Sequence, residues 1–317
     1  MEIQHIDKPF KNSFDNLPEE DRALVESYFK GFDYRGAGYT FLANYIWRTS
    51  YCIAWEIIEG YLCMAGADCM DETRDAIIAM PLTKDGNYDP ERLGKALMEC
   101  KRRFDEREIP FVVAMIHSHM VPILEEALPG GLEFERERDD DEYVYLKEKL
   151  ITLSGRALHK KKNHLNYFLR NFEYEVKKIS PDMEDEVMAL SDEIKDTKEL
   201  NPAEVNSLEH EHNAIKEMIS LTDEEDVYSV AIYIKGKLQA FAMGERLSEN
   251  TAVEHFEKAN DDFRGLYQLV CSEFCKSLPE EIEFVNREED MGLENLRQAK
   301  EALKPDHMEE KYSAIFK

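Results

Sequence analysis

The stretch TAVEHFEKANDDFRGLYQLVCSEFCKSLPEEIEFVNREEDMGLENLRQAK, residues 251–300, decides the fold. Residues 251–258 alternate apolar and polar side chains, which predicts a half-buried strand. Between 263 and 278 apolar residues recur every three or four positions, as on one face of a helix. A short apolar strand at 282–286 and a helix at 293–303 complete the order. This order predicts an α/β fold in which polar side chains gather where strands end and helices begin.

The rest of the chain predicts the same kind of architecture twice. Residues 227–234 and 238–243 read as a hairpin, and helices are expected on its N-terminal side. The first half likewise predicts a meander of antiparallel strands, then a helix at 90–106 and a buried strand at 111–115. We therefore expect two tandem α/β domains, 1–150 and 151–317, with mixed and mainly antiparallel sheets.

Composition narrows the class of protein. Lys and Arg number 40 against 67 Asp and Glu, which gives a formal net charge of −27. Such an excess of acid works against non-specific adhesion to nucleic acid or anionic membranes. No apolar run approaches the roughly 20 residues that span a bilayer, and the first residues resemble neither a signal nor a transit peptide. We expect a cytoplasmic protein without a transmembrane segment.

Cysteine and histidine spacing indicates no metal centre. The chain has six cysteines but no paired C-x-x-C spacing, and most of them lie among apolar residues. This pattern predicts reduced thiols packed in the core at Cys52, Cys63, Cys69, Cys100, Cys271 and Cys275. The pairs at 117/119 and 210/212 are histidines without a third ligand at a zinc spacing, so no metal is expected.

One segment, 156–170, is basic in this acidic chain. Its apolar residues are spaced helically, and its cations are Arg156, Lys160, Lys161, Lys162 and Arg170. A basic amphipathic helix can dock a polyanion, and the polyanion expected here is the phosphate backbone of RNA. It can equally be a solvated helix whose cations pair with nearby acidic runs, and the sequence leaves both interpretations open.

Charged residues also crowd on the strand 251–258. Alternation puts Glu254 and His255 on opposite faces, as it does Glu257 and Lys258. A carboxylate that faces a cleft can serve as a general base toward a nucleophile. The alternative is ordinary ion pairing on the solvent face of a sheet.

The turn that follows the second strand is the other polar cluster. It contains an amide, a cation and three acids, Asn286, Arg287, Glu288, Glu289 and Asp290. Such a turn can hold the ammonium and polar groups of an amino acid. It can also be a charged loop in which Asp290 caps the next helix, with Arg297 as ion partner or anion ligand. Asp261 and Asp262 begin the preceding helix and would repel the diphosphate of coenzyme A.

Three motifs carry a resemblance to a known family. LSGRALHKKKNHLN (153–166), EHFEKAN (254–260) and VNREEDMGL (285–293) resemble bacterial proteins of the DUF2156 type. These are related to the C-terminal catalytic domain of phosphatidylglycerol lysyltransferase. The resemblance spans nearly the whole chain and implies two tandem domains of the GNAT (acyl-CoA N-acyltransferase) fold, as in the Fem transferases. Those relatives move an amino acid from aminoacyl-tRNA to an amine or hydroxyl.

Carried over to this sequence, the resemblance implies a site in the second domain. The implied catalytic residues are Glu257, Arg287 and Asp290. The implied substrate-binding residues are Lys258, Asn260, Asn286, Glu288 and Arg297. The basic helix would meet tRNA, the expected donor, and coenzyme A is less favoured. The acceptor, a small molecule, a peptide or a lipid, is left open. The alternatives are an acyl-CoA-dependent N-acyltransferase acting on a small amine and a non-catalytic module that binds RNA or an amino acid.

Overall fold

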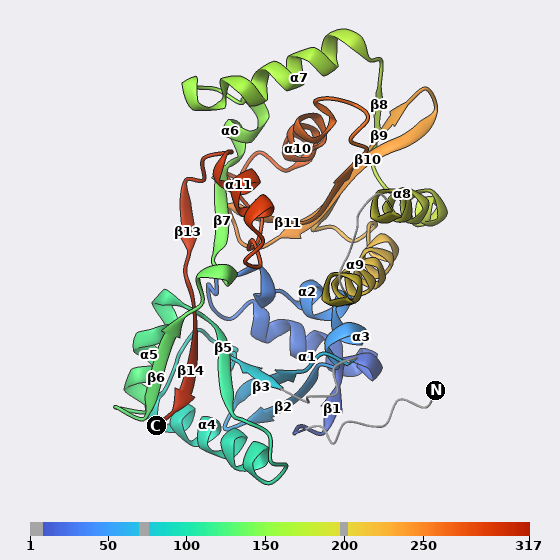
Figure 1. The fold of residues 1–317 in the computed structure, drawn as a ribbon. Helices are drawn as coiled ribbons and strands as arrows, with labels where there is room; N and C mark the ends of the chain where they lie inside the picture. Colours follow the sequence, from blue (N-terminus) through green and yellow to red (C-terminus); the bar gives the residue numbers. More distant parts are fainter. Residues whose placement is uncertain (1–8, 70–75, 197–201) are drawn as a thin grey trace. The chain divides into compact units, whose positions relative to one another are not determined.

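The computed structural model describes residues 9–69, 76–196 and 202–317 (Figure 1). The chain forms two compact units, one made of Met1–Arg138 with Glu309–Lys317 and one made of Asp139–Met308. Each unit is an α/β structure with its own seven-stranded sheet. Within the described ranges, no helix combines the length and the apolar content needed to cross a bilayer.

The sheet of the first unit has the strand order β1-β2-β3-β4-β5-β14-β6. Its strands are β1 (Asn12–Ser13), β2 (Ala54–Ile58), β3 (Tyr61–Gly66), β4 (Ile77–Ala79), β5 (Val112–His117), β6 (Leu132–Arg136) and β14 (Lys311–Phe316). Its helices are α1 (Glu19–Phe29), α2 (Phe41–Ile46), α3 (Arg48–Tyr51), α4 (Pro90–Asp105) and α5 (Val121–Ala127). Helix α4 shows why these elements form. Asp89 caps its first turn and Pro90 starts it, while Leu93, Leu97 and Phe104 are buried along one face.

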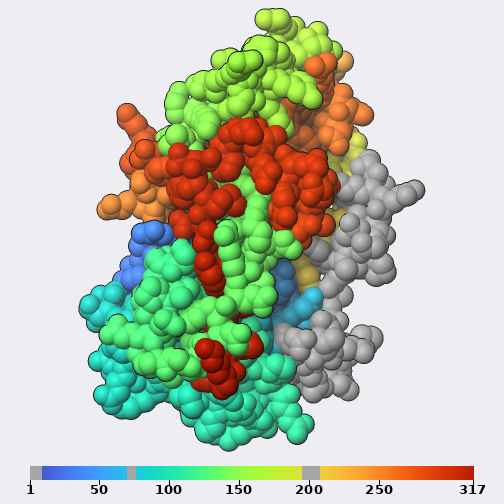
Figure 2. All heavy atoms as spheres, turned by 60° about the vertical axis from the view of Figure 1, so that its left-hand side comes forward, coloured from blue at the N-terminus to red at the C-terminus, as the bar shows by residue number. Residues whose placement is uncertain are grey.

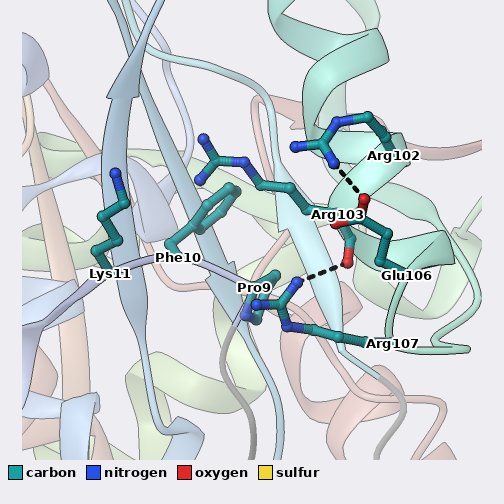
Figure 3. A pocket seen from close by; sticks show the side chains of 7 residues that line it. All are labelled: Pro9, Phe10, Lys11, Arg102, Arg103, Glu106 and Arg107. Atoms are coloured by element: carbon teal, nitrogen blue, oxygen red, sulfur yellow. Dashed lines mark hydrogen bonds and ion pairs between the residues drawn. The ribbon is translucent and has the colours of Figure 1, made fainter.

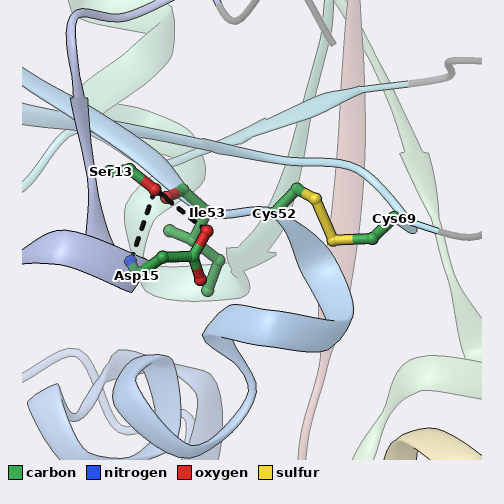
Figure 4. The surroundings of a disulfide bond; sticks show 5 residues. All are labelled: Ser13, Asp15, Cys52, Ile53 and Cys69. Atoms are coloured by element: carbon green, nitrogen blue, oxygen red, sulfur yellow. Dashed lines mark hydrogen bonds between the residues drawn. A yellow bond between two sulfur atoms is a disulfide. The ribbon is translucent and has the colours of Figure 1, made fainter. Parts of the chain in front are cut away.

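The first unit corrects the prediction that all six cysteines are reduced core thiols. Cys52 and Cys69 form a disulfide (Figure 4). The backbone N–H of Cys69 donates to the carbonyl of Ser50, and the two cysteine Cα atoms lie 5.4 Å apart. This proximity depends on a tertiary contact across 17 residues, which spacing alone does not reveal. The other four cysteines are free and buried, as predicted.

The sheet of the second unit has the strand order β13-β7-β12-β11-β10-β9-β8. Its strands are β7 (Glu142–Leu146), β8 (Glu175–Lys177), β9 (Val227–Ile234), β10 (Lys237–Arg246), β11 (Thr251–Ala259), β12 (Phe284–Asn286) and β13 (His307–Glu309). Its helices are α6 (Lys147–Thr152), α7 (His159–Asn171), α8 (Glu184–Asp196), α9 (Pro202–Ser220), α10 (Leu266–Ser277) and α11 (Glu294–Glu301). Helix α10 covers one face of the sheet and α8 covers the other (Figure 1).

The two units differ from the predicted division at residue 150. Strand β7, expected in the first domain, pairs antiparallel with β12 in the second sheet. Strand β14, expected in the second domain, lies between β5 and β6 in the first sheet. Strand partners are chosen by contacts far apart in sequence, so local patterns do not assign a strand to a sheet.

Two features of the second sheet position polar side chains. Strand β11 pairs in parallel with β12 from Thr251 to Val253, whereas the strand itself continues to Ala259. Opposite β10, the register jumps so that Gly244 faces Glu254 and Met243 faces Phe256. His255 is therefore the extra residue of a β-bulge. Beyond the bulge the alternation of faces is inverted.

Candidate functional site

The main polar cluster of the second unit lies where β11 and β12 separate. Arg287 directly follows β12, and its Nε forms an ion pair with Oε2 of Glu254. Its Nη2 lies 2.9 Å from Oε2 of Glu257. The side chain of Glu254 is 1% exposed and that of Glu257 is 13% exposed. One guanidinium thus holds two largely buried carboxylates together, and we name these the Glu254–Glu257 pair.

The β-bulge explains why these two carboxylates meet. In a regular strand, residues three positions apart point to opposite faces. The extra residue at His255 turns Glu257 to the face already occupied by Glu254, the face covered by α10. The predicted residues Glu257 and Arg287 are therefore brought together, and Glu254 joins them as a residue that sequence reasoning did not select. A bulge has no signature in this alternating stretch that would have identified Glu254.

The Glu254 carboxyl is in an unusual electrostatic position. Burial raises its pKa to about 8, with the charge of Glu257 acting in the same direction and Arg287 opposing both. Its Oε1 accepts no hydrogen bond from any described residue. The Cys271 sulfur on α10 and one oxygen of each carboxylate lie within 4.8 Å of one another. Arg287 already supplies positive charge to this pair, so a bound cation would have to compete with it.

Helix α7 contributes one residue to this cluster. Lys161 is half-buried and lies on the same helical face as the buried Leu165 and Phe168. Burial lowers its pKa, and the neighbouring charge of Arg287 lowers it further while Glu257 opposes this. Of the five predicted anion-binding residues, Lys161 is therefore the one that lies on the buried face of the helix, near enough to Arg287 and Glu257 for their charges to shift its pKa.

The other four predicted anion-binding residues lie at the surface. Arg156, Lys160, Lys162 and Arg170 are exposed, and Figure 2 shows this part of the chain, in yellow-green, on the outside of the second unit. Across the described ranges, no acidic side chain forms an ion pair with any of the four. Both interpretations of this helix, docking of a polyanion and pairing with acidic runs, stay predictions.

A second buried group adjoins the Glu254–Glu257 pair. His255 places Nδ1 2.7 Å from Oε1 of Glu288 and Nε2 3.0 Å from Oε1 of Glu245. Burial lowers the pKa of His255, but hydrogen bonds to Glu245 and Glu288 outweigh it and raise this pKa to about 10. His255 is therefore an imidazolium at neutral pH. The predicted substrate ligand Glu288 is instead engaged by this imidazolium.

Replacing His255 with glutamine is expected to flatten the pH dependence of stability above neutrality. The folded pKa of about 10 lies above the unfolded value of about 6.5, so the proton stabilises the fold below pH 6.5. This contribution is lost as the pH rises through about 10. Urea unfolding at intervals from pH 6.5 to 10 should show a smaller loss of unfolding free energy in His255→Gln than in the wild type. Equal slopes would contradict a charged His255.

Asp290 is held by bonds within the protein. Its oxygens accept hydrogen bonds from Tyr143 Oη (2.6 Å), from Arg297 Nε (2.9 Å) and Nη2 (2.7 Å), and from the Gly292 N–H (3.0 Å). Burial alone would raise the pKa of Asp290, but the bonds from Arg297 and Tyr143 hold it well below its usual range. A general base needs a free lone pair and a pKa nearer neutrality. The geometry thus favours an anchoring role for Asp290 and Arg297 over the predicted catalytic and substrate-binding roles.

The remaining predicted ligands are also engaged within the unit. The buried Asn286 amide donates to Glu142 (2.5 Å), and its Oδ1 accepts the Glu288 N–H. Asn260 donates to Gln239 (2.9 Å) at the end of β11. Lys258 is paired at 2.6 Å with Glu211 of α9. These contacts place Lys258 away from Glu257, as alternation predicted.

Two surface hollows lie elsewhere. One, in the first unit, has a volume of about 390 Å³ and is lined by Pro9, Phe10, Lys11, Arg102, Arg103, Glu106 and Arg107 (Figure 3). Its arginines resemble an anion site, but Arg102 already pairs with Glu106 and Arg103 with Glu56 at 2.6 Å. The other hollow is lined by parts of α6 and residues 280–283. Neither hollow is lined by the Glu254–Glu257 pair or by Arg287. We therefore select these three residues as the candidate site for their buried charges, and not because they line a hollow.

Several known proteins resemble this chain in sequence or in fold. A conserved protein of unknown function from Bacteroides thetaiotaomicron superposes with a TM-score of 0.80 and 28% identity, covering 98% of this chain and 99% of that chain. L-PGS from Bacillus licheniformis gives a TM-score of 0.61 at 13% identity, covering 94% and 92%. FemX superposes with a TM-score of 0.63 at 7% identity, covering 93% of this chain and 96% of that chain. An uncharacterized protein of Mycoplasmoides gallisepticum is 26% identical over 176 residues, and the match spans 54% of each chain, about half the length of that relative.

The fold and the family follow from these matches. A tandem GNAT protein from the clavulanic acid biosynthesis pathway superposes with a TM-score of 0.53 at 8% identity, covering 97% of both chains. The predicted class, two tandem GNAT-like domains with mainly antiparallel sheets, is confirmed. The resemblance stated from the three motifs is confirmed as well. The family described as phosphatidylglycerol lysyltransferase, C-terminal, matches residues 29–315, and the chain belongs to it.

Proposed function

We propose that this protein is an aminoacyltransferase that moves an aminoacyl group from aminoacyl-tRNA to an amine or hydroxyl acceptor. The observation that carries the proposal is Glu257, a partly exposed carboxylate held by Arg287 at the separation of β11 and β12. Membership of the lysyltransferase family and the likeness of fold to FemX support transfer chemistry. Transfer from tRNA also fits the cytoplasmic location expected from the sequence.

The proposed roles follow from the charges of the cluster. The acceptor's amine or hydroxyl attacks the ester carbonyl of the aminoacyl group, and Glu257 orients this nucleophile and takes its proton. Arg287 keeps Glu257 in place and contributes positive charge near the oxyanion that develops on the carbonyl. Lys161 adds a second positive charge on the side of α7.

The exposed cations of α7 are proposed to bind the phosphates of tRNA. Arg156, Lys160, Lys162 and Arg170 are free of acidic partners within the described ranges, so their charge is available to a polyanion. Each phosphate contact releases counterions, so binding should weaken steeply with salt. Lys161, on the inner face of the same helix, would lie nearest the esterified end.

The test of catalysis is transfer from bulk bacterial tRNA charged with labelled amino acids to primary amine acceptors. Glu257→Gln should lower the rate of transfer by about 10²–10⁴-fold, because the carboxylate that takes the proton is lost. The matched control is Glu249→Gln, an exposed glutamate of the same unit, and it should react at the wild-type rate. Full activity of folded Glu257→Gln would overturn the assignment of Glu257. Turnover with acetyl-coenzyme A and none with charged tRNA would instead favour an acyl-CoA transferase.

The test of docking is tRNA binding at two salt concentrations. A triple variant, Lys160→Gln, Lys162→Gln and Arg170→Gln, should bind at least about 10-fold more weakly and show a smaller salt dependence. The control removes the same charge from another surface of the unit through Lys216→Gln, Lys235→Gln and Lys237→Gln, all exposed. Equal weakening by both triple variants would mean that net charge, rather than α7, determines the binding.

A further inference from the structure

The inner member of the Glu254–Glu257 pair has no role in the scheme above. Glu254 is 1% exposed, and its Oε1 has no hydrogen-bond partner among the described residues. The outer member, Glu257, is 13% exposed and is therefore the more accessible of the two. Both use Oε2 toward Arg287, so one guanidinium serves two buried carboxylates. A bare buried carboxylate with a free oxygen is costly, which makes a proton the simplest partner for Glu254.

The surroundings of Glu254 come from every element packed against it. The charged and titratable groups that act on it or lie beside it are Glu257, Arg287, Cys271 of α10, Tyr145 of β7 and Lys300 of α11. Lys161 of α7 is near enough to Glu257 and Arg287 for their charges to shift its pKa. Arg287 is the cation in direct contact with the pair. Cys271 is itself protonated, because its hydrogen bond with Cys275 and its burial raise the pKa of its thiol. Among the described residues, Arg287 is the one cation in an ion pair with these two carboxyls, which lie within 4.8 Å of each other, and this leaves room for one shared proton.

We propose that Glu254 and Glu257 act as a single proton-sharing carboxyl pair, in which Glu254 stores the proton that Glu257 exchanges with the reacting groups. This rests on the proposed function. Before reaction the pair holds one proton. As the acceptor's nitrogen or oxygen bonds to the ester carbonyl, the nucleophile's proton passes to Glu257, and the pair holds two. When the bond from that carbon to the ribose oxygen breaks, one proton passes to the leaving oxygen and the pair returns to one. Glu254 is thus a positioning residue that acts through Glu257.

The first measurement needs no substrate. In protein labelled with ¹³C at the glutamate carboxyls, the Glu254 signal is assigned by its loss in Glu254→Gln and followed from pH 4 to 10. We expect a midpoint above about 7 in the wild type and a decrease of at least about one pH unit in Glu257→Gln, because the neighbouring negative charge is removed. A Glu254 midpoint near the ordinary value of about 4.3 in both proteins would overturn the inference.

The second measurement tests whether Glu254 stores a proton for the reaction or only packs in the core. Glu254→Gln keeps the shape of the side chain but cannot exchange a proton, so kcat should decrease by about 10²-fold with KM for charged tRNA unchanged. The pH profile of kcat should lose the dependence that Glu254 imposes near pH 8. Glu254→Asp, which retains a carboxyl, should recover part of kcat, and urea unfolding of both variants checks the fold.

The outcomes distinguish this inference from the proposed function. Active transfer with unchanged kcat and pH profile in folded Glu254→Gln overturns the inference and leaves the transferase assignment standing. If no charged tRNA reacts, the proposed function fails, whereas a Glu254 midpoint above about 7 that depends on Glu257 still supports the shared proton.

Discussion

Replacing Arg287 with methionine is expected to lower the free energy of unfolding by about 3–5 kcal/mol at pH 8 and to abolish transfer. Methionine fills much of the same volume but leaves the negative charge of the Glu254–Glu257 pair without its cation, and an uncompensated buried charge carries a cost of this size. Arg287 also opposes the rise in the pKa of Glu254, so its loss should raise that pKa further. A carboxyl whose folded pKa is raised loses stability as the pH increases, so the variant's stability should fall more steeply than the wild type's between pH 5 and 9.

The control for this prediction is Arg246→Met. Arg246 also pairs with two carboxylates, Asp226 and Glu281, but these are 63% and 58% exposed. Solvent screens such pairs, so the variant should lose no more than about 1 kcal/mol. Adding Glu254→Gln and Glu257→Gln to Arg287→Met should recover part of the lost stability, since the cost lies in the unpaired charges. Similar losses in Arg287→Met and Arg246→Met would contradict a buried cluster.

Most of the helices and strands could be predicted from the sequence, because the patterns that indicate them lie within short stretches of the chain. The alternation of residues 251–258 and the helical spacing of 263–278 correspond to β11 and α10. Their order also predicted the α/β class. The sheet to which β7 and β14 belong could not be predicted, because hydrogen-bond partners more than 100 residues away determine it. The Cys52–Cys69 disulfide was missed for the same reason.

Only part of the candidate site could be predicted from the sequence. Glu257 and Arg287 were selected from the charge at strand ends, and the structure joins them. Glu254 was not selected, because only the β-bulge at His255 turns Glu257 to the face of the sheet on which Glu254 lies. Lys161 was grouped with the surface cations, although helical spacing from Leu165 and Phe168 indicates that it faces inward. Charge and residue type therefore locate such a site, whereas the direction of each side chain depends on backbone detail that composition does not encode.

Asp290 was predicted to be catalytic, but we expect its replacement to lower the stability of the fold rather than to remove a step of the reaction. Asp290→Asn removes the negative charge that Arg297 and Tyr143 hold, and it exchanges an acceptor for a donor facing Arg297. Because hydrogen bonds to charged groups contribute about 1.5–3 kcal/mol each, the variant should lose about 2–4 kcal/mol of unfolding free energy at pH 7. The matched control is Asp261→Asn, an exposed aspartate in the same unit, which should change stability by less than about 0.5 kcal/mol.

The pH dependence then distinguishes an anchor from a base. The folded pKa of Asp290 is depressed, so its ionised form stabilises the protein above the unfolded value of about 3.9, and this contribution is lost as the pH falls below it. Urea unfolding of the wild type should therefore show a decrease in stability below about pH 4 that is smaller in Asp290→Asn. Any transfer that the folded variant retains should have the wild-type pH profile, because an anchor changes how much protein is folded and not which group takes the proton. A variant of wild-type stability that has lost transfer would instead restore Asp290 as a base, and the bonds from Arg297 and Tyr143 would then have to break during reaction.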